Sequence, residues 1–399
     1  MVNLAFKFML EISKPTGMWE KIIMAFNSGI SNYAWAIIIF TIVLKLVLSP
    51  LDFLNRYISV KNAKVQAVIQ PEIAKLQKQC GNNKQLLNQK TMELYKKNNY
   101  NVTGSCIIML VNLVLTLVIF ITLFGGLNTM AAYKNAFQYN EIQKSYYSVE
   151  DYGVENLKDK YKAYYEEYYT LNSANEDYSK AENETYAKTK TVEYIESFNS
   201  EENTQKATER YKEVKDSWLW IDNVWKPDTP WTNSVPNFNE YASAARINFA
   251  DEKFTISEQE ITLSSATIKD IAEVEYNQIM SPIRDTNGRA NGYLIVVILA
   301  AGVNALSILA SQGKLKFKKR NKSEDAPKQP GGFLMAVLIP GLMIYITMTY
   351  NAVFGLYIFV SSLVGLALTP LVNYLIGVIE KRKQAKKDKE ITVSYSRKK

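Results

Sequence analysis

Histidine is absent from the 399-residue sequence. Its absence excludes histidine-based catalytic triads, most zinc sites and a histidine pH switch. The two cysteines, Cys80 and Cys106, match no metal-ligand spacing, so we interpret both as free thiols. The sequence also contains no phosphate-binding loop, dinucleotide-binding fingerprint or serine-nucleophile motif. We therefore predict a protein that is not an enzyme and that holds no metal or cofactor.

Charge is unevenly distributed along the chain. Residues 131–290 carry 18 Lys or Arg and 29 Asp or Glu, a net charge of −11. The remainder carries 29 bases and 10 acids, a net charge of +19. The overall charge of +8 is therefore the difference between a basic part and an acidic insert.

Long apolar runs indicate a membrane protein, because a bilayer core of ~30 Å needs about 20 apolar residues of helix. The predicted spans are residues 33–54, 105–130, 291–311, 333–350 and 351–379. The last two share one uncharged run about twice as long as a bilayer is thick, and Tyr350-Asn351 is the expected turn between them. The predicted fold class is an all-α polytopic membrane protein with five spans.

Basic residues in the connecting segments predict the orientation. Residues 55–104 have nine bases and two acids. Residues 312–332 have seven bases and two acids, and residues 380–399 have nine bases and three acids. Because basic loops remain in the cytoplasm, all three segments are expected there. Five spans then place the N-terminal segment, residues 1–32, and the acidic insert outside, with the C-terminus in the cytoplasm.

Two segments outside the spans have helical patterns. Met18, Trp19 and Ile22 begin an apolar face typical of an amphipathic helix at the membrane surface. Residues 55–104 read as a helical hairpin that turns at Gly81-Asn82-Asn83. Two amphipathic arms are long for a mere connector, so we favour a working role. The residues expected to matter in it are Pro71, Leu76, Gln77, Leu94 and Tyr95.

The acidic insert is expected to be mainly helical, with an α+β alternative. A tyrosine stripe follows helical spacing, and we interpret it as a helix-packing seam rather than a ligand site; it comprises Val154, Leu157, Tyr161, Tyr164 and Tyr168. Short β-like runs follow at Phe254–Ile256 and Ile261–Leu263. Four of the six tryptophans lie in Trp218–Trp231, which suits the outer membrane–water interface.

Lys45 lies within the apolar run of the first span, where a charge costs about 2.5–3.5 kcal/mol on insertion scales. If the span ran from Ile22 to Leu44, Lys45 would snorkel at its end. The polar run before Tyr33 makes a poor helix start, so we favour a span from Tyr33 with Lys45 about 18 Å along it, facing a wet interior. Polar residues in the spans could line the same cavity or form helix–helix hydrogen bonds. These candidates are Thr41, Asn112, Thr116, Asn304, Ser307, Tyr345, Thr347 and Ser361.

Several motifs together resemble the YidC/Oxa/Alb family of membrane protein insertases. The run from Trp35 to Leu51, with Lys45 inside it, resembles the first core span of that family. The other similar motifs are Pro71–Gln77, Tyr95–Cys106, Trp220-Ile-Asp222 with Asp228, and Ile339–Tyr345 with Asn351. The resemblance covers about half of the chain, in the order that the family has.

The resemblance implies a hydrophilic groove open to the cytoplasm and the lipid, with Lys45 at the position of the family's groove cation. That cation is usually arginine, which forks to carboxylates, whereas lysine is a point charge. In the second span, Ile108, Asn112 and Val114 stand where proline, glutamine and proline are common. The acidic insert is also far larger than the family usually has between these spans.

These observations predict a bacterial cell-membrane insertase and chaperone for nascent membrane proteins, with no DNA partner. The Sec translocon and the ribosome are further candidate partners. The basic tail would contact ribosomal RNA or anionic lipid through Lys381, Arg382, Lys383, Lys386 and Lys387. The alternatives are a solute or ion transporter with Lys45 as counter-ion, and an envelope receptor or assembly factor acting through the insert. No internal repeat supports the transporter.

Overall fold

The computed structural model describes residues 14–81, 83–98, 102–148, 157–175, 177–311 and 332–396. The described chain is mostly helical and forms two compact units. The core unit comprises Ile38–Phe124, Leu299–Leu342 and the residues from Tyr357 onward. The insert unit comprises the residues up to Ile37, Gly125–Ile298 and Met343–Leu356. The predicted basic loop, residues 312–332, lies outside the described residues apart from Gly332.

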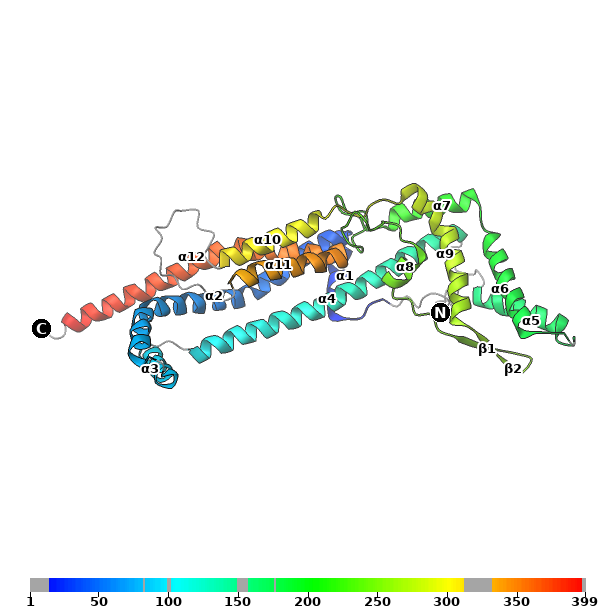
Figure 1. Cartoon of the computed structure of the whole chain (residues 1–399). Helices are drawn as coiled ribbons and strands as arrows, with labels where there is room; N and C mark the ends of the chain where they lie inside the picture. Colours follow the sequence, from blue (N-terminus) through cyan, green and yellow to red (C-terminus); the bar gives the residue numbers. More distant parts are fainter. Residues whose placement is uncertain are drawn as a thin grey trace. The chain divides into compact units, whose positions relative to one another are not determined.

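Long helices make up the core unit, and several continue into the insert unit (Figure 1). They are α2 (Tyr33–Cys80), α3 (Lys84–Lys97), α4 (Val102–Tyr147), α10 (Ile295–Ser311), α11 (Gly332–Thr349) and α12 (Ala352–Ser396). Within the described residues, three stretches are long and apolar enough to cross a membrane: Tyr33–Asn62, Leu113–Tyr147 and Ala352–Lys386. A shorter apolar helix covers Ile295–Ser307. The five-span arrangement stays a prediction.

The expected helix boundaries are confirmed at two turns. Tyr350 and Asn351 separate α11 from α12. Gly81 has a φ of 52°, a left-handed conformation that glycine adopts without strain, and it follows the last residue of α2. Asn83 then caps α3 by accepting a hydrogen bond from the Leu86 amide at 3.0 Å.

Helix α2 joins the first predicted span to the first arm of the hairpin in 48 continuous residues. It contains Pro50 and Pro71, each of which removes a backbone hydrogen bond and crowds the preceding turn. Figure 1 shows that α2 changes direction before it reaches α3. Helix α2 therefore runs unbroken across residue 54, the predicted border between the first span and the hairpin.

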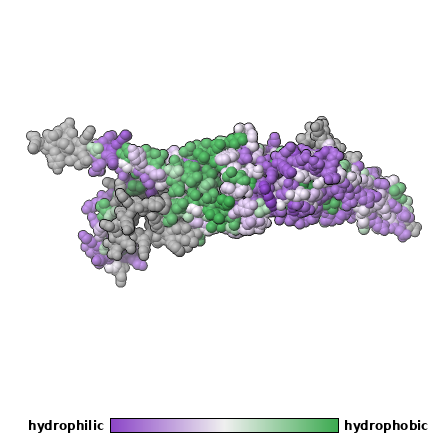
Figure 2. Space-filling model, turned by 90° about the horizontal axis from the view of Figure 1, so that it is seen from above, coloured by the Kyte–Doolittle hydropathy of each residue, from purple (hydrophilic) through white to green (hydrophobic). Residues whose placement is uncertain are grey.

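Polar contacts join α2 and α12 within the core unit. The Arg56 Nε donates to the Asn373 Oδ1 at 3.2 Å, and the Lys383 ammonium donates to the Tyr57 hydroxyl at 2.5 Å. Apolar side chains instead point outward along α4. Between 48% and 63% of each side chain is exposed at Leu110, Val114, Leu117 and Ile121. Figure 2 shows apolar residues over the core-unit helices and mostly hydrophilic residues over the insert unit.

The insert unit is built around the end of α4 and contains further short elements. These are α1 (Met18–Ile30), α5 (Leu157–Asn172), α6 (Lys180–Glu196), α7 (Glu201–Val214), α8 (Phe238–Ala244), β1 (Glu252–Ile256), β2 (Gln259–Leu263) and α9 (Ser265–Asn287). Helix α1 confirms the predicted amphipathic helix, and α2 begins at Tyr33 as expected. The strands form an antiparallel hairpin in which Phe254 pairs with Ile261, which confirms the predicted β runs.

The core of the insert unit is aromatic. Tyr161 and Tyr165 of α5 are 1% and 0% exposed and contact the Phe254 ring, so the tyrosine stripe is the predicted packing seam. Val154 lies outside the described residues. The Tyr241 and Tyr276 rings stack with centroids 4.7 Å apart, a geometry that adds to the effect of area burial.

Candidate functional site

The predicted groove cation, Lys45, lies on the apolar part of α2 and is half-buried. Thr41 lies one helical turn earlier on the same face and is fully buried. The adjoining Leu46 and Val47 are 51% and 69% exposed, as expected if they contact lipid. Among the residues that the structure describes, Lys45 forms no ion pair. This part of α2 therefore has Thr41 and the positive charge of Lys45 on one face, with the exposed Leu46 and Val47 beside them.

Other predicted groove residues in the core unit lie on α10 and α12. Asn304, Ser307 and Ser361 are half-buried. The Asn304 Nδ2 donates to the Ser362 hydroxyl at 3.4 Å, while the Asn304 Oδ1 is buried without a partner among the described atoms. This contact is a hydrogen bond between α10 and α12, and the free amide oxygen leaves one acceptor for water or substrate.

The remaining predicted groove residues are divided between the two units. Thr116 is exposed on α4, and the Asn112 side chain lies outside the described residues. Tyr345 and Thr347 belong to the insert unit. Tyr345 is 67% exposed, whereas Thr347 is 2% exposed and donates to the Met343 carbonyl at 2.6 Å. The Thr347 hydroxyl is thus satisfied within its own helix.

A groove of about 410 Å³ lies between the two arms of the helical hairpin. Apolar and charged side chains line it, from α2 and from α3: Glu72, Lys75, Leu76, Gln79, Lys90, Glu93, Leu94 and Lys97. The predicted hairpin residues Leu76 and Leu94 both line it. Pro71 and Gln77 are exposed, and Tyr95 is half-buried. An apolar floor with a mixed charged rim suits transient contact with an amphipathic peptide segment.

The predicted tail contacts lie on the last turns of α12. Lys381, Arg382 and Lys386 are exposed, while the Lys387 side chain lies outside the described residues. Lys383 differs from the others because its ammonium bonds the Tyr57 hydroxyl and lies 5.1 Å from that ring's centroid. The tail thus offers free cations on the helix that also contacts α2.

Sequence reasoning gave no site role to the segment between Asp216 and Trp231, which the structure places at the ends of two apolar helices. The Asp228 carboxylate accepts from the Tyr293 amide at 2.9 Å and the Val296 amide at 2.7 Å, so it caps α10. The Lys226 carbonyl accepts from the Ala352 amide at 2.8 Å at the start of α12. We call residues 222–229 the capping segment.

The capping segment is buried and strongly charged. Asp222 is 2% exposed and forms ion pairs with Lys215, at 2.7 Å, and with Arg289. Burial opposes ionisation of this carboxyl, but the Arg289 and Lys215 hydrogen bonds hold its pKa below the usual range. Gly292 contacts the segment so closely that a methyl group there would overlap the Asp228 carboxylate. Only a residue without a side chain fits beside this cap.

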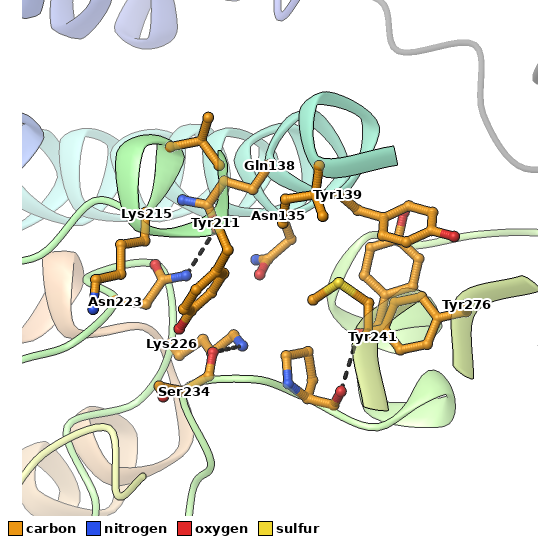
Figure 3. A pocket seen from close by; sticks show the side chains of 14 residues that line it. Asn135, Gln138, Tyr139, Tyr211, Lys215, Asn223, Lys226, Ser234, Tyr241 and Tyr276 are labelled. Atoms are coloured by element: carbon orange, nitrogen blue, oxygen red, sulfur yellow. Dashed lines mark hydrogen bonds between the residues drawn. The ribbon is translucent and has the colours of Figure 1, made fainter. Parts of the chain in front are cut away.

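A small cavity of about 20 Å³, lined by both polar and apolar side chains, lies beside the capping segment inside the insert unit (Figure 3). The Lys226 side chain enters it and donates to the Ser234 carbonyl, while the Asn223 Nδ2 donates to the Gln138 Oε1 at 2.8 Å. This volume holds about one water molecule. Burial lowers the pKa of Lys226 to about 7.

A second buried ionisable group lies in the same unit on α9. Glu275 is 1% exposed and accepts from the Tyr147 hydroxyl at 2.8 Å. Burial raises the pKa of this carboxyl to about 7, although the Tyr147 hydrogen bond opposes the rise. The interior of the insert unit therefore contains a base and an acid that both titrate near neutral pH.

Comparisons with known proteins bear on the N-terminal part of the chain. Residues 25–172 match the model of the 60Kd inner membrane protein family. Proteins named membrane protein insertase YidC are similar as well. The one from Jannaschia sp. is 39% identical over 117 residues, which are 27% of this chain and 18% of that protein. This part of the chain resembles the membrane protein insertases.

Other relatives agree with this similarity. The YidC insertase of Fusobacterium nucleatum is 37% identical over 98 residues, 25% of this chain and 46% of that protein. That of Leptospira interrogans is 41% identical over 84 residues, 21% of this chain and 13% of that protein. The chain thus spans less than half the length of these relatives. No solved structure matches it.

The matched residues include the charged span and the hairpin. Thr41, Lys45 and the groove between α2 and α3 all fall within residues 25–172. The capping segment, Asn304 and Ser361 lie outside them. With its apolar helices and this similarity, the chain is a membrane protein.

Proposed function

We propose that the chain is a membrane protein insertase that helps nascent membrane proteins to enter the bilayer and fold, alone or with the Sec translocon. The observation that carries the proposal is the family match over residues 25–172, which contain both Lys45 and the hairpin. The five predicted spans would surround a groove open to the cytoplasm and to lipid. The N-terminus and the insert would lie outside the cell membrane, and the hairpin and tail inside.

The hairpin groove supports a first contact with the nascent chain. Leu76 and Leu94 offer apolar surface, while Lys75, Lys90 and Lys97 can attract acidic residues. The opening is wide, so contact there is weak and exchangeable. A weak site is what a receiving surface needs, because the segment must leave it for the membrane.

Lys45 supports an electrostatic role in the next step. A half-buried ammonium within the apolar part of α2 attracts the acidic or polar end of a substrate more strongly than it could in bulk water. A wet groove shortens the low-dielectric path for that end and lowers the cost of moving it. The apolar segment then moves into lipid, and its hydrophobic transfer drives the process without a nucleotide.

The test is insertion of two substrates, one with an acidic tail and one with a neutral tail, by Lys45→Leu and Lys45→Arg variants. We expect Lys45→Leu to lower insertion of the acidic-tailed substrate about tenfold, equivalent to about 1.4 kcal/mol of lost attraction. Lys45→Arg should retain activity. Lys61→Leu, an exposed lysine on the same helix, is the matched control. Equal insertion of both substrates by Lys45→Leu would refute the electrostatic role.

The basic tail is proposed to contact the ribosome through the exposed Lys381, Arg382 and Lys386. Contacts to RNA phosphates release counterions, so binding should weaken steeply with salt. Cosedimentation of ribosomes with the full chain and with a chain ending at Glu380, at two salt concentrations, measures this. Unchanged binding after removal of the tail would leave anionic lipid as its partner.

A further inference from the structure

Trp218–Ile221 forms a tight hairpin with an unusual residue at its tip. The Trp218 amide donates to the Ile221 carbonyl at 2.9 Å, and the Ile221 amide donates back to the Trp218 carbonyl at 2.8 Å. Leu219, at the first tip position, has a φ of 50°. A two-residue hairpin with positive φ at this position normally carries glycine. A leucine there is strained, and such strain points to a role for the side chain.

The Leu219 side chain does not contribute to the protein interior. It is 71% exposed, so burial in this chain does not compensate for the backbone strain. Its neighbours are aromatic: the Trp218 and Trp220 rings lie 5.6 Å apart, and the Trp218 ring lies 5.9 Å from that of Trp35 on α2. The Asn32 side chain also donates to the Ser217 carbonyl at 3.2 Å. The hairpin is therefore held against the first turn of an apolar helix.

Exposed apolar residues continue along that helix. Trp35 is 48% exposed, and Ile39 and Val43 follow at intervals of four residues with 40% and 43% exposure. A second apolar helix, α10, begins just after Tyr293, which is 61% exposed. Tryptophan and tyrosine at the ends of membrane helices favour the level of the lipid headgroups.

We propose that the Trp218–Ile221 hairpin is a membrane anchor whose Leu219 side chain enters the boundary between headgroups and acyl chains. Lipid is the occupant that fits, because the hairpin extends the exposed apolar stripe of α2 and because aromatic rings flank the leucine. The Leu219 side chain is exposed on this turn and is not buried in its own unit. The proposal rests on the membrane location of the chain and does not depend on insertion activity.

The experiment places a fluorophore at Leu219 and measures its contact with lipid. Leu219→Cys, in a full chain with Cys80→Ser and Cys106→Ser, is labelled with nitrobenzoxadiazole and reconstituted in phosphatidylcholine–phosphatidylglycerol vesicles. The matched control is Leu171→Cys, which replaces a leucine with 74% exposure at the end of α5. Lipids carry a doxyl quencher at a shallow or a deep acyl position.

We expect at least twofold stronger quenching at position 219 than at position 171, with the shallow quencher more effective than the deep one. Equal quenching at both positions overturns the proposal. Equal thermal unfolding midpoints of the two labelled proteins show that neither label has disrupted the fold.

A second measurement needs no label. Brominated lipids should quench part of the tryptophan emission, and Trp220→Phe should reduce that quenchable part. Trp225→Phe is the control, because Trp225 is 2% exposed and its ring centroid lies 5.1 Å from that of Tyr33. If both substitutions leave the quenchable part unchanged, the hairpin does not contact lipid.

Discussion

The two units place their apolar residues in opposite directions. In the insert unit, aromatic and aliphatic side chains such as Tyr161 and Tyr276 are buried together, and charged residues cover the surface. In the core unit, leucine and valine along α4 point outward, and the polar Asn304 is turned toward α12. The same chain thus follows two rules, as expected for an insert unit that faces water and core-unit helices whose apolar parts face lipid.

The solvent also explains where charge is tolerated. The insert unit holds Asp222, Lys226 and Glu275 inside, each with hydrogen-bond partners. The apolar part of α2 holds Lys45, half-buried and without an ion pair among the described residues. Buried charges in the first unit contribute to a fixed structure, whereas Lys45 is the charge that we propose attracts a substrate.

The largest expected effect is the loss of an aromatic side chain from the insert unit. Tyr161→Ala removes a ring that is 1% exposed and should lower the free energy of unfolding of this unit by about 3–5 kcal/mol. Chemical denaturation followed by near-ultraviolet circular dichroism measures it. Tyr164→Ala, at a half-buried position on the same helix, is the control and should cost clearly less.

The next effect tests the outward apolar surface of the core unit directly. Leu117→Asp and Leu171→Asp alter leucines that are 48% and 74% exposed in the core and insert units. Leu117→Asp should make the free energy of membrane integration about 3 kcal/mol less favourable, because an aspartate replaces a leucine within an apolar helix. Leu171→Asp, at a surface exposed to water, should lower the free energy of unfolding by less than about 0.5 kcal/mol. Membrane integration and thermal unfolding are the measurements, and equal effects would break the comparison.

The buried charges of the insert unit predict a stability minimum near pH 7. The folded-state pKa of Glu275 is raised to about 7, so its stabilising contribution is present below about pH 4.5 and lost as pH rises through 7. The folded-state pKa of Lys226 is lowered to about 7, so stability is lost as pH falls from about 10.5 to 7.

Two substitutions separate these slopes. Glu275→Gln should remove the loss of stability between about pH 4.5 and 7 and should raise stability at pH 7.5. Lys226→Met should remove the loss of stability between about pH 10.5 and 7. Replacing a buried charge with a neutral group of similar size often stabilises by about 1–4 kcal/mol. Unfolding midpoints between pH 4 and 10 measure both. Glu273→Gln, a half-exposed glutamate on the same helix, should leave the pH profile intact.

The smallest effect concerns the cap of α10. Gly292→Ala should displace the Asp228 carboxylate and cost about 0.5–2 kcal/mol, the value of a helix cap. Gly302→Ala, within α10 and with open space around it, should be neutral or slightly stabilising. Hydrogen exchange of the first α10 amides reports the cap, and unaltered exchange in Gly292→Ala would show that the cap is dispensable.

Sequence patterns predicted the elements well where a local rule governs them. Periodicity gave helix α1 and the tyrosine seam. The polar run before Tyr33 gave the start of α2, and the length of the last uncharged run gave the Tyr350-Asn351 turn. The β hairpin followed from two short runs of alternating apolar residues. The border at residue 54 between the first span and the hairpin stays a prediction, because α2 continues through it as one helix.

The sequence by itself determined that this is a membrane protein with an acidic, mainly helical insert, because hydrophobicity and charge act through composition and spacing alone. Only the tertiary structure revealed the Asp228 cap, the buried Lys226 and Glu275, and the strained Leu219 hairpin. These depend on groups more than 60 residues apart, such as Asp228 and Val296, or on backbone angles that no local pattern specifies. Long-range burial, rather than sequence spacing, sets their chemistry.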